Sequence, residues 1–285
     1  MAITNRYDFI MLFDVENGNP NGDPDAGNTP RMDAETGYGY ITDVCLKRKI
    51  RNFVELAKEG ESGYNILVKP DKALNTRFAE AYDAEQLERG KKGKKADDVK
   101  KARDYMCRNY FDVRAFGAVM STGDNPCGIV RGPVQITFAR SLSQINIEDV
   151  TITRQARTTE DRQETGGTEM GRKSIIPYAL YRAEGYISAA LAQKVTGLSD
   201  DDVELLWDAI VNMFENDHSA ARGKMCMRKL YIFKHDSTLG NCPSHVLFDK
   251  VEVSLKEEKP PRQFADYTIH VDDAMPEGVT LIEKI

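Results

Sequence analysis

The chain has 285 residues, of which 41% are hydrophobic and 29% charged, and its formal net charge is −6. These values are ordinary for a soluble globular protein and allow one large domain or a core domain with insertions. The acidic balance argues against nucleic-acid binding, although a basic groove can coexist with an acidic exterior. No apolar run reaches the ~18 residues of a membrane span. The five cysteines lack C-x-x-C spacing and no signal-type segment is present, so we expect a cytoplasmic protein.

The first predicted element is a buried strand, residues 7–15, followed by a loop rich in Asn, Gly, Pro and Asp over residues 17–31. This loop is longer than a simple connection requires, which favours a function. Residues 17–28 partly match a calcium-binding loop. Asn28 stands where such loops carry Glu, however, and a strand precedes the loop, so a surface loop with Asx and Gly turns is favoured.

A helix is predicted to begin after Thr42 as N-cap, because apolar residues recur from Leu46 onward at i, i+4, i+7, i+8 and i+11. Its cations gather within five positions, at Lys47, Arg48, Lys49 and Arg51. Glu55 and Glu59 are the only acids after the first turn, so this face is poorly neutralised. Both a solvated face and a phosphate contact remain open.

Residues 60–108 differ in composition from the rest of the chain. Two polar helical patterns, around residues 72–82 and 96–108, flank the basic run of residues 89–95. The two glycines of that run predict an exposed tip, which is either solvated or in contact with nucleic acid. We interpret the whole segment as a helical insertion into the core domain.

Two strands are predicted next, at residues 111–120 and 129–138, and Pro133 places the start of the second at a sheet edge or bulge. Arg114 and Arg131 lie where these strands begin, beside glycines that allow another backbone to come close.

Strands at residues 150–157 and 174–181 are joined by a long polar loop, which predicts a protruding arm. Arg154 and Arg157 lie at the exit of the first strand. Met170 is the only large apolar residue of the loop, and Arg172 and Lys173 follow it. A lone Met in a loop is more often incidental packing, but at the tip of an arm it also fits the wedges of DNA-bending proteins.

The C-terminal part begins with the strongest helix. Ser199 and the acids after it form a capping signal, and apolar residues follow at helical spacing from Val203 to Phe214, with Trp207 in the core. Three further strands are predicted at residues 230–234, 247–255 and 267–271. This order of elements predicts an α+β protein with a largely antiparallel sheet.

Catalytic signals are weak. None of the four histidines has metal-ligand spacing, and His235, in Lys-His-Asp, is the one candidate for a metal ligand or base. Asp14, Asp23 and Asp25 could form a Mg²⁺ cluster near the first loop, but Asp at the start of a loop is more often a turn former. No nucleophile motif, phosphate loop or dinucleotide fingerprint is present. A binding protein without cofactor or metal is therefore favoured.

Four pairs of sequence blocks together resemble the backbone subunit of type I CRISPR Cascade complexes, of the RAMP superfamily, closest to the type I-C form. They are YDFIMLFDVENGNPNGDPDAGNTPR with ITDVCLKRKIRN, DVRAFGAVMSTG with CGIVRGPVQITFARS, ITRQARTT with MGRKSIIPYALYR, and LLWDAIVNMFENDHSAARG with LYIFKHDSTLGN. The resemblance implies a modified RRM-like (ferredoxin-like) palm at residues 1–59 and 109–285, a helical fingers insertion at 60–108, and a β-hairpin thumb at 150–178.

The resemblance further implies a non-catalytic subunit that polymerises head-to-tail along CRISPR RNA. Such subunits hold the phosphate backbone and kink it at regular intervals, so that the guide pairs with target DNA in antiviral defence. The expected partners are therefore CRISPR RNA, target DNA through the guide, neighbouring copies, and the large, small and guide 5′-end-capping subunits. No membrane is involved.

Carried onto this chain, the resemblance gives palm contacts at Arg31, Lys47, Lys49, Arg51, Arg114 and Arg131. It gives thumb contacts at Arg154, Arg157, Met170, Arg172 and Lys173, with Met170 as the wedge. The alternative is a metal-dependent endoribonuclease of the same superfamily that uses a loop Asp. Asp14, Asp23, Asp25 and Asp33 lie in the first loop region, and no pattern marks one of them.

Overall fold

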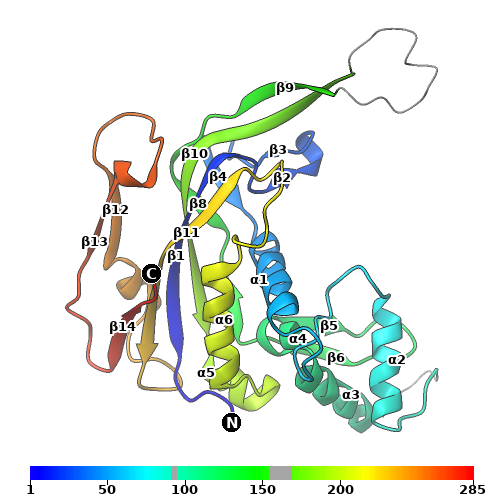
Figure 1. Cartoon of the computed structure of the whole chain (residues 1–285). Helices are drawn as coiled ribbons and strands as arrows, with labels where there is room; N and C mark the ends of the chain where they lie inside the picture. Colours follow the sequence, from blue (N-terminus) through cyan, green and yellow to red (C-terminus); the bar gives the residue numbers. More distant parts are fainter. Residues whose placement is uncertain (91–94, 155–168) are drawn as a thin grey trace, which may run out of the picture.

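The computed structural model describes residues 1–90, 95–154 and 169–285. Its centre is a sheet in the order β14–β11–β1–β10–β8–β4, in which β7 and β9 also pair with β10 (Figure 1). All of these described strand pairs are antiparallel, which confirms the predicted class. The strands are β1 (Tyr7–Gly18), β4 (Tyr38–Ile41), β7 (Val134–Ile136), β8 (Ala139–Gln144), β9 (Glu148–Arg154), β10 (Glu169–Ile187), β11 (Lys224–His235) and β14 (Val279–Glu283).

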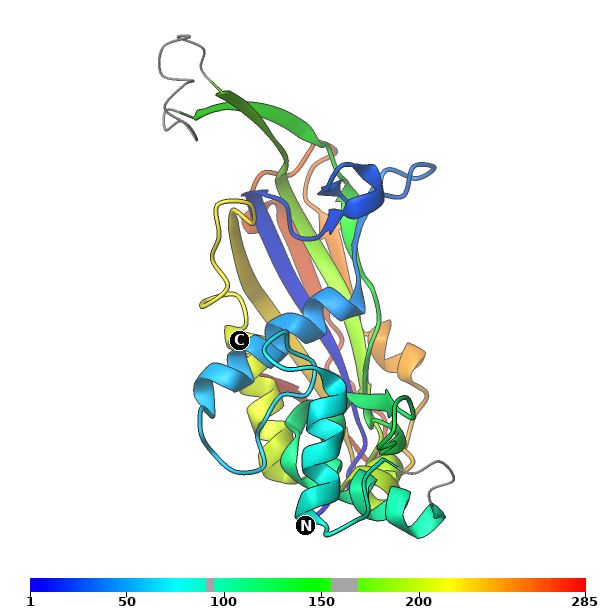
Figure 2. The ribbon, with the colours of Figure 1, turned by 90° about the vertical axis from the view of Figure 1, so that its right-hand side faces the viewer.

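Both faces of β1 are covered in the stretch 9–13, which explains the uninterrupted apolar run there. Phe9 and Phe13 point toward α1 (Asp43–Ala57) and α6 (Asp200–Asn212), and Trp207 packs edge-on against Phe9 with ring centroids 5.1 Å apart. Ile10 on the other face packs in a separate cluster with α7 (Ser244–Phe248) and the hairpin β12 (Val251–Leu255) and β13 (Tyr267–Val271). Figure 2 shows α1 in front of the strands and the orange hairpin behind them.

A second body lies beside the sheet, at the lower right of Figure 1. It has its own apolar cluster, which includes Phe78, Tyr82, Met106, Val113 and Val130. Its elements are α2 (Leu74–Ala84), α3 (Ala96–Asn109), α4 (Phe111–Phe116), β5 (Gly117–Met120) and β6 (Gly128–Arg131). The two predicted helices of the 60–108 segment are therefore confirmed. The cluster also includes residues after 108. The division into palm, fingers and thumb stays a prediction.

Three predicted strands are partly wrong. Residues 111–120 form α4 and then β5. All six residues of α4 are buried, so its sequence lacks the polar face by which a surface helix is recognised. Residues 129–138 are split into β6 and β7, and Gly132 and Pro133 lie between the two strands. Pro133 has no N–H for a strand pair, and a Cβ on Gly132 would lie 2.1 Å from the Phe116 carbonyl carbon. The 247–255 segment starts inside α7 and becomes strand only at Val251.

Local capping signals are confirmed. The Thr42 hydroxyl accepts from the Cys45 N–H at 3.3 Å, and Ser199 and Asp202 form a reciprocal capping box. Short elements complete the chain: β2 (Gly22–Asp23), the 3₁₀ turns Pro24–Ala26 and Phe264–Asp266, β3 (Thr29–Pro30), α5 (Ala189–Leu191) and the π turn Ala192–Thr196. No helix of the described residues is long and apolar enough to cross a bilayer.

The predicted arm is confirmed as a two-stranded ribbon. β9 and the first part of β10 pair from Glu169↔Arg154 to Ile175↔Glu148. Figure 1 shows this ribbon projecting away from the sheet. Arg157 and the remainder of the connecting loop lie outside the described residues, as do residues 91–94 of the basic run.

Candidate nucleic-acid interface

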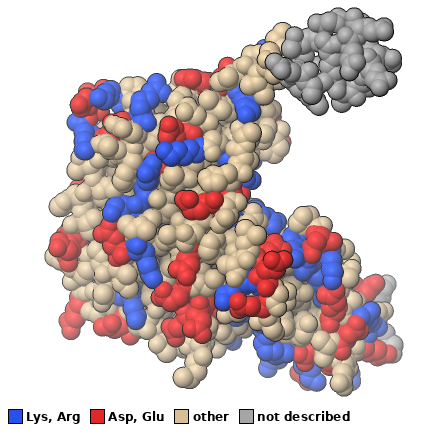
Figure 3. Space-filling model, in the orientation of Figure 1, with Lys and Arg blue, Asp and Glu red and all other residues tan. Residues whose placement is uncertain are grey.

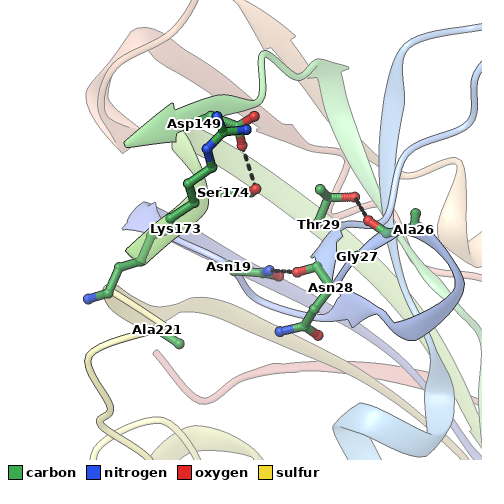
Figure 4. Close-up of a pocket in the computed structure, with 10 residues that line it drawn as sticks. Asn19, Ala26, Gly27, Asn28, Thr29, Asp149, Lys173, Ser174 and Ala221 are labelled. Carbon is green, nitrogen blue, oxygen red and sulfur yellow. Dashed lines mark hydrogen bonds between the residues drawn. The ribbon is translucent and has the colours of Figure 1, made fainter. Parts of the chain in front are cut away.

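Two adjoining hollows lie where the arm leaves the sheet. The first, of about 370 Å³, has Asp149 and Lys173 of the arm on one side and the loop at Asn28 on the other (Figure 4). The second, of about 360 Å³, lies between the same loop, α1 and residues 217–222. Both hollows are lined by Asn19, Asn28 and Ala221, so they form one continuous surface, which we call the α1–arm groove. In the view of Figure 3, a recess separates the arm from the lower body.

The groove wall is built from closely approaching backbones. A Cβ on Gly18 would lie 1.8 Å from the Arg222 carbonyl oxygen, so only glycine allows the 217–223 segment to lie against the end of β1. Asn28 has a positive φ of 63°, which Asn tolerates. The Asn19 side-chain amide donates to the Asn28 carbonyl at 2.7 Å and ties the two ends of the loop together. The glycine- and asparagine-rich loop thus shapes one side of the groove.

Cations reach the groove from three separate elements. They are Arg48 and Lys49 of α1, Arg172 and Lys173 of the arm, and Arg222 of the 217–222 loop. Lys173 Nζ donates to the Ala220 carbonyl at 2.8 Å, which joins the arm to that loop. Against these five positive charges stand the carboxylates of Asp149 and Asp217, so five minus two leaves a formal charge of +3. The groove is therefore basic on a chain whose net charge is −6.

Three of the predicted contact residues are largely buried. Arg51 donates through Nε to Asp112 Oδ2 at 2.8 Å, and Arg114 forms a bidentate pair with Asp202. Each arginine is 8% exposed. The third is Lys49, whose side chain is 3% exposed although it lines the groove. Arg51 and Arg114 hold helices together, and their charges are already compensated.

The other predicted palm residues lie near the surface but do not line the groove. Lys47 pairs with Asp43 at 2.9 Å, and Arg31 pairs with Asp23 at 3.4 Å. Arg131 is exposed on β6, in the second body. None of the three is among the described residues that line either hollow.

The predicted arm residues fall into two groups. Arg172 and Lys173 line the groove, and Met170, two positions before Arg172, is 76% exposed. The Arg154 backbone pairs with Glu169 near the end of the described ribbon. Arg157 lies outside the described residues.

Sequence reasoning missed Arg222 as a groove residue. It lies in a segment without helical or strand periodicity, so no pattern indicated its orientation. The one signal in the sequence was the glycine that follows it, Gly223. In the structure Gly223 has a φ of 63°, and a Cβ there would lie 2.5 Å from the Glu16 carbonyl oxygen. Arg48 lies on the basic helix but is not among the predicted contact residues. It lines the groove while its Nη1 donates to the Val68 carbonyl at 2.6 Å.

Three of the four candidate carboxylates of the nuclease alternative, those of Asp14, Asp23 and Asp33, have local structural roles. Asp14 is 2% exposed and accepts from the Tyr178 hydroxyl at 2.9 Å and from Arg228 Nε at 2.8 Å; its burial raises its pKa above the usual range. Asp23 caps the 3₁₀ turn that follows it. The Glu35 N–H and the backbone and side chain of Thr36 lower the pKa of Asp33.

His235, the other catalytic candidate, is fully buried. Its Nδ1 accepts from the Asn241 N–H at 2.9 Å, so Nε2 carries the proton and donates to Asp8 Oδ2 at 3.0 Å. The ring is thus fixed between two partners inside the fold. Within residues 1–90, 95–154 and 169–285, no group of three His, Cys, Asp or Glu side chains is arranged to hold a metal ion.

The protein is of the α+β class, with a candidate nucleic-acid interface. Its antiparallel sheet has helices on one face and a hairpin on the other, and a basic groove lies at the foot of the projecting arm. The chain belongs to the family described as CRISPR-associated protein Cas7, whose sequence profile matches residues 5–272.

Individual relatives agree with this assignment. A protein of Haloferax volcanii named CRISPR-associated protein Cas7 is 28% identical over 241 residues, which cover 74% of this chain and 66% of the relative, just under two thirds of its length. Among solved structures, the fold is similar to a chain of a CRISPR RNA-guided surveillance complex in a pre-nicking state. That match has a TM-score of 0.50 at 16% identity and covers 80% of this chain and 78% of the other. At this identity the likeness concerns the fold alone.

Proposed function

We propose that the chain is a non-catalytic backbone subunit of a CRISPR surveillance complex, of the type I-C form. It polymerises along CRISPR RNA, holds the phosphate backbone and kinks it at regular intervals, so that the guide pairs with target DNA. The observation that carries this proposal is the α1–arm groove, in which a helix, a loop and an arm contribute cations to one continuous surface.

The lining of the groove favours backbone contact over base reading. Arginine and lysine side chains bind phosphates without sequence information. Among the described residues that line the groove, none is aromatic, so a base-stacking platform is not built there. A protein that must accept any guide needs this property, because sequence is then read by base pairing.

The arm supports the kinking part of the proposal. Met170 presents a large apolar side chain to solvent near the end of the described ribbon, and the groove cations Arg172 and Lys173 follow it. An apolar side chain that enters a base step must unstack it, and nearby cations hold the phosphates on either side. In this assignment the arm (residues 150–178) is the thumb, residues 60–108 are the fingers, and residues 1–59 and 109–285 are the palm.

Assembly follows from the same assignment. A subunit that repeats along one RNA strand uses two different surfaces for its two neighbours, and such heterologous contacts give open helical filaments rather than closed dimers. The large, small and guide 5′-end-capping subunits are the further proposed partners of this filament.

Co-expression with a CRISPR array tests the proposal. The purified protein is expected to carry RNA, seen as a raised 260/280 nm absorbance ratio, and to form head-to-tail oligomers in electron-microscopy class averages. Binding of unrelated single-stranded RNAs should show similar affinities that fall steeply with salt. Recovery of RNA-free protein after co-expression would reject the proposal.

A further inference from the structure

The hollow between α1 and the 217–222 loop contains a chain of three charges. Lys49 Nζ contacts Asp217 Oδ2, and Arg222 Nη1 lies 2.7 Å from Asp217 Oδ1. The Lys49 and Asp217 side chains are 3% and 10% exposed, whereas that of Arg222 is 39% exposed. Asp217 therefore holds a buried lysine with one oxygen and a solvent-accessible arginine with the other.

Of the described residues that line this hollow, Asp217 alone is acidic, and it pairs with Lys49 and Arg222. A carboxylate that accepts from an arginine occupies one of the positions in which a phosphate oxygen would bind the same guanidinium. The buried Lys49 needs an anion beside it, because an uncompensated buried charge is strongly unfavourable. Arg222 has no such need, since water reaches it.

The position of Asp217 is fixed by its own backbone. Its N–H donates to the Phe214 carbonyl at 3.2 Å, and its carbonyl accepts from Arg222 Nη1 at 3.0 Å. Lys49 Nζ also lies 5.7 Å from the centroid of the Phe214 ring. The carboxylate thus lies in the wall of the hollow, between Lys49 and Arg222.

We propose that Asp217 is an internal substitute for an RNA phosphate: it neutralises Arg222 in the RNA-free groove and competes with a guide phosphate for that arginine. The inference rests on the proposed RNA-binding function and adds to it a residue that weakens binding. The expected effect is a lower affinity of the groove for phosphate than the same cations would have without Asp217.

The test compares the affinities of Asp217→Asn and wild type for a single-stranded RNA of mixed sequence. Removal of the competing charge should tighten binding about tenfold at low salt. Asp217→Ser is a second neutral variant of different shape and should change the affinity in the same direction. Glu252→Gln is the matched control, since it removes an exposed acid from β12, on the opposite face of the sheet, and should leave affinity unchanged. All affinities refer to the folded fraction.

A double-mutant cycle with Arg222→Gln identifies the arginine concerned. Arg222→Gln alone should weaken binding and lower the salt slope by about one. In that background the gain from Asp217→Asn should be clearly smaller, because the two groups act on one another. An equal gain in both backgrounds would overturn the inference, because Asp217 would then act independently of Arg222. Unchanged affinity in both neutral variants would also overturn it. Weaker RNA binding by both would overturn it and make Asp217 a positioning residue. If wild type itself binds no RNA, the proposed function fails instead.

Discussion

Arg114 and Asp202 form a bidentate ion pair inside the protein, with Arg114 Nε and Nη2 lying 2.8 and 2.7 Å from the two carboxylate oxygens. Arg114 belongs to α4 of the second body, and Asp202 lies in the first turn of α6. Arg114 Nη1 also donates to the carbonyls of Gly63, Cys107 and Arg108. This one guanidinium therefore joins the second body to the helix that covers the main sheet.

Replacement of Arg114 by Met should lower the free energy of unfolding by about 3–5 kcal/mol, because Asp202 is left as a buried charge without its partner. Urea unfolding measures this loss. Arg114→Lys keeps the charge but not the two-pronged geometry, so an intermediate loss is expected. The RNA affinity of the folded fraction should not change in either variant. A loss below about 1 kcal/mol for Arg114→Met would contradict the structural role.

The role of this arginine illustrates what the sequence does not contain. Helix α6, the Thr42 cap and the arm were predicted because their signals are local: a capping residue, a helical period or an alternating run next to a polar loop. The partners of Arg51 and Arg114 are 61 and 88 residues away. A cation at helical spacing looks the same whether it faces a phosphate or a distant carboxylate, so only tertiary structure distinguishes the two.

Buried ion pairs also explain the wrong strand at residues 111–120. Asp112 and Arg114 read as the polar positions of an alternating strand, yet both are buried in α4 with ionic partners. Of the groove itself, the arm residues Arg172 and Lys173 and the α1 residue Lys49 were predicted. Arg222 was not, because it lies in an aperiodic loop and is brought to the groove by the close approach of Gly18 and Gly223 to neighbouring backbones.

Substitution of Lys173 tests the arm side of the groove. Lys173→Ala should weaken binding of all RNA sequences to a similar extent and reduce the salt slope by about one, because a phosphate contact carries no sequence information. The measurement is fluorescence anisotropy at several salt concentrations. Lys250→Ala is the matched control: Lys250 pairs with Asp272 beside the β12–β13 hairpin and should not alter the slope. An unchanged slope for Lys173→Ala would place the RNA elsewhere.

Cys45 offers a chemical probe of groove occupancy. It lines the α1 side of the groove, and burial raises the pKa of its thiol. The charges of Lys49 and Arg222 lower this pKa, and that of Asp217 raises it further. Alkylation by iodoacetamide should therefore accelerate at a higher pH than for a free cysteine. Bound RNA should slow the reaction several-fold, as measured by peptide mass spectrometry. The partly exposed Cys242 serves as the internal reference, and equal protection of both thiols would point to global rather than local shielding.

Asp14 makes a testable contribution to the pH dependence of stability. Burial raises the pKa of Asp14 in the folded chain, and the folded state therefore binds a proton that the unfolded state releases. Its contribution is present below the unfolded pKa, about 3.9, and is lost as pH rises through the raised native value.

The difference in unfolding free energy between wild type and Asp14→Asn should accordingly decrease as pH rises from about 4. Urea unfolding of both proteins at a series of pH values measures it. A difference that grows with pH would mean that Arg228 and Tyr178 outweigh burial and lower the native pKa of Asp14.

Substitution of Met170 should affect the bending of RNA more than its affinity. Its side chain is 76% exposed, so Met170→Gly removes little packing from the fold, and affinity should stay within about twofold. If the side chain enters a base step, its loss allows the bases to restack. Chemical footprinting of the bound guide should then lose its periodic reactive nucleotides in Met170→Gly and keep them in Met170→Leu, which retains an apolar wedge. An unchanged footprint in Met170→Gly would show that the kink is made by another part of the arm.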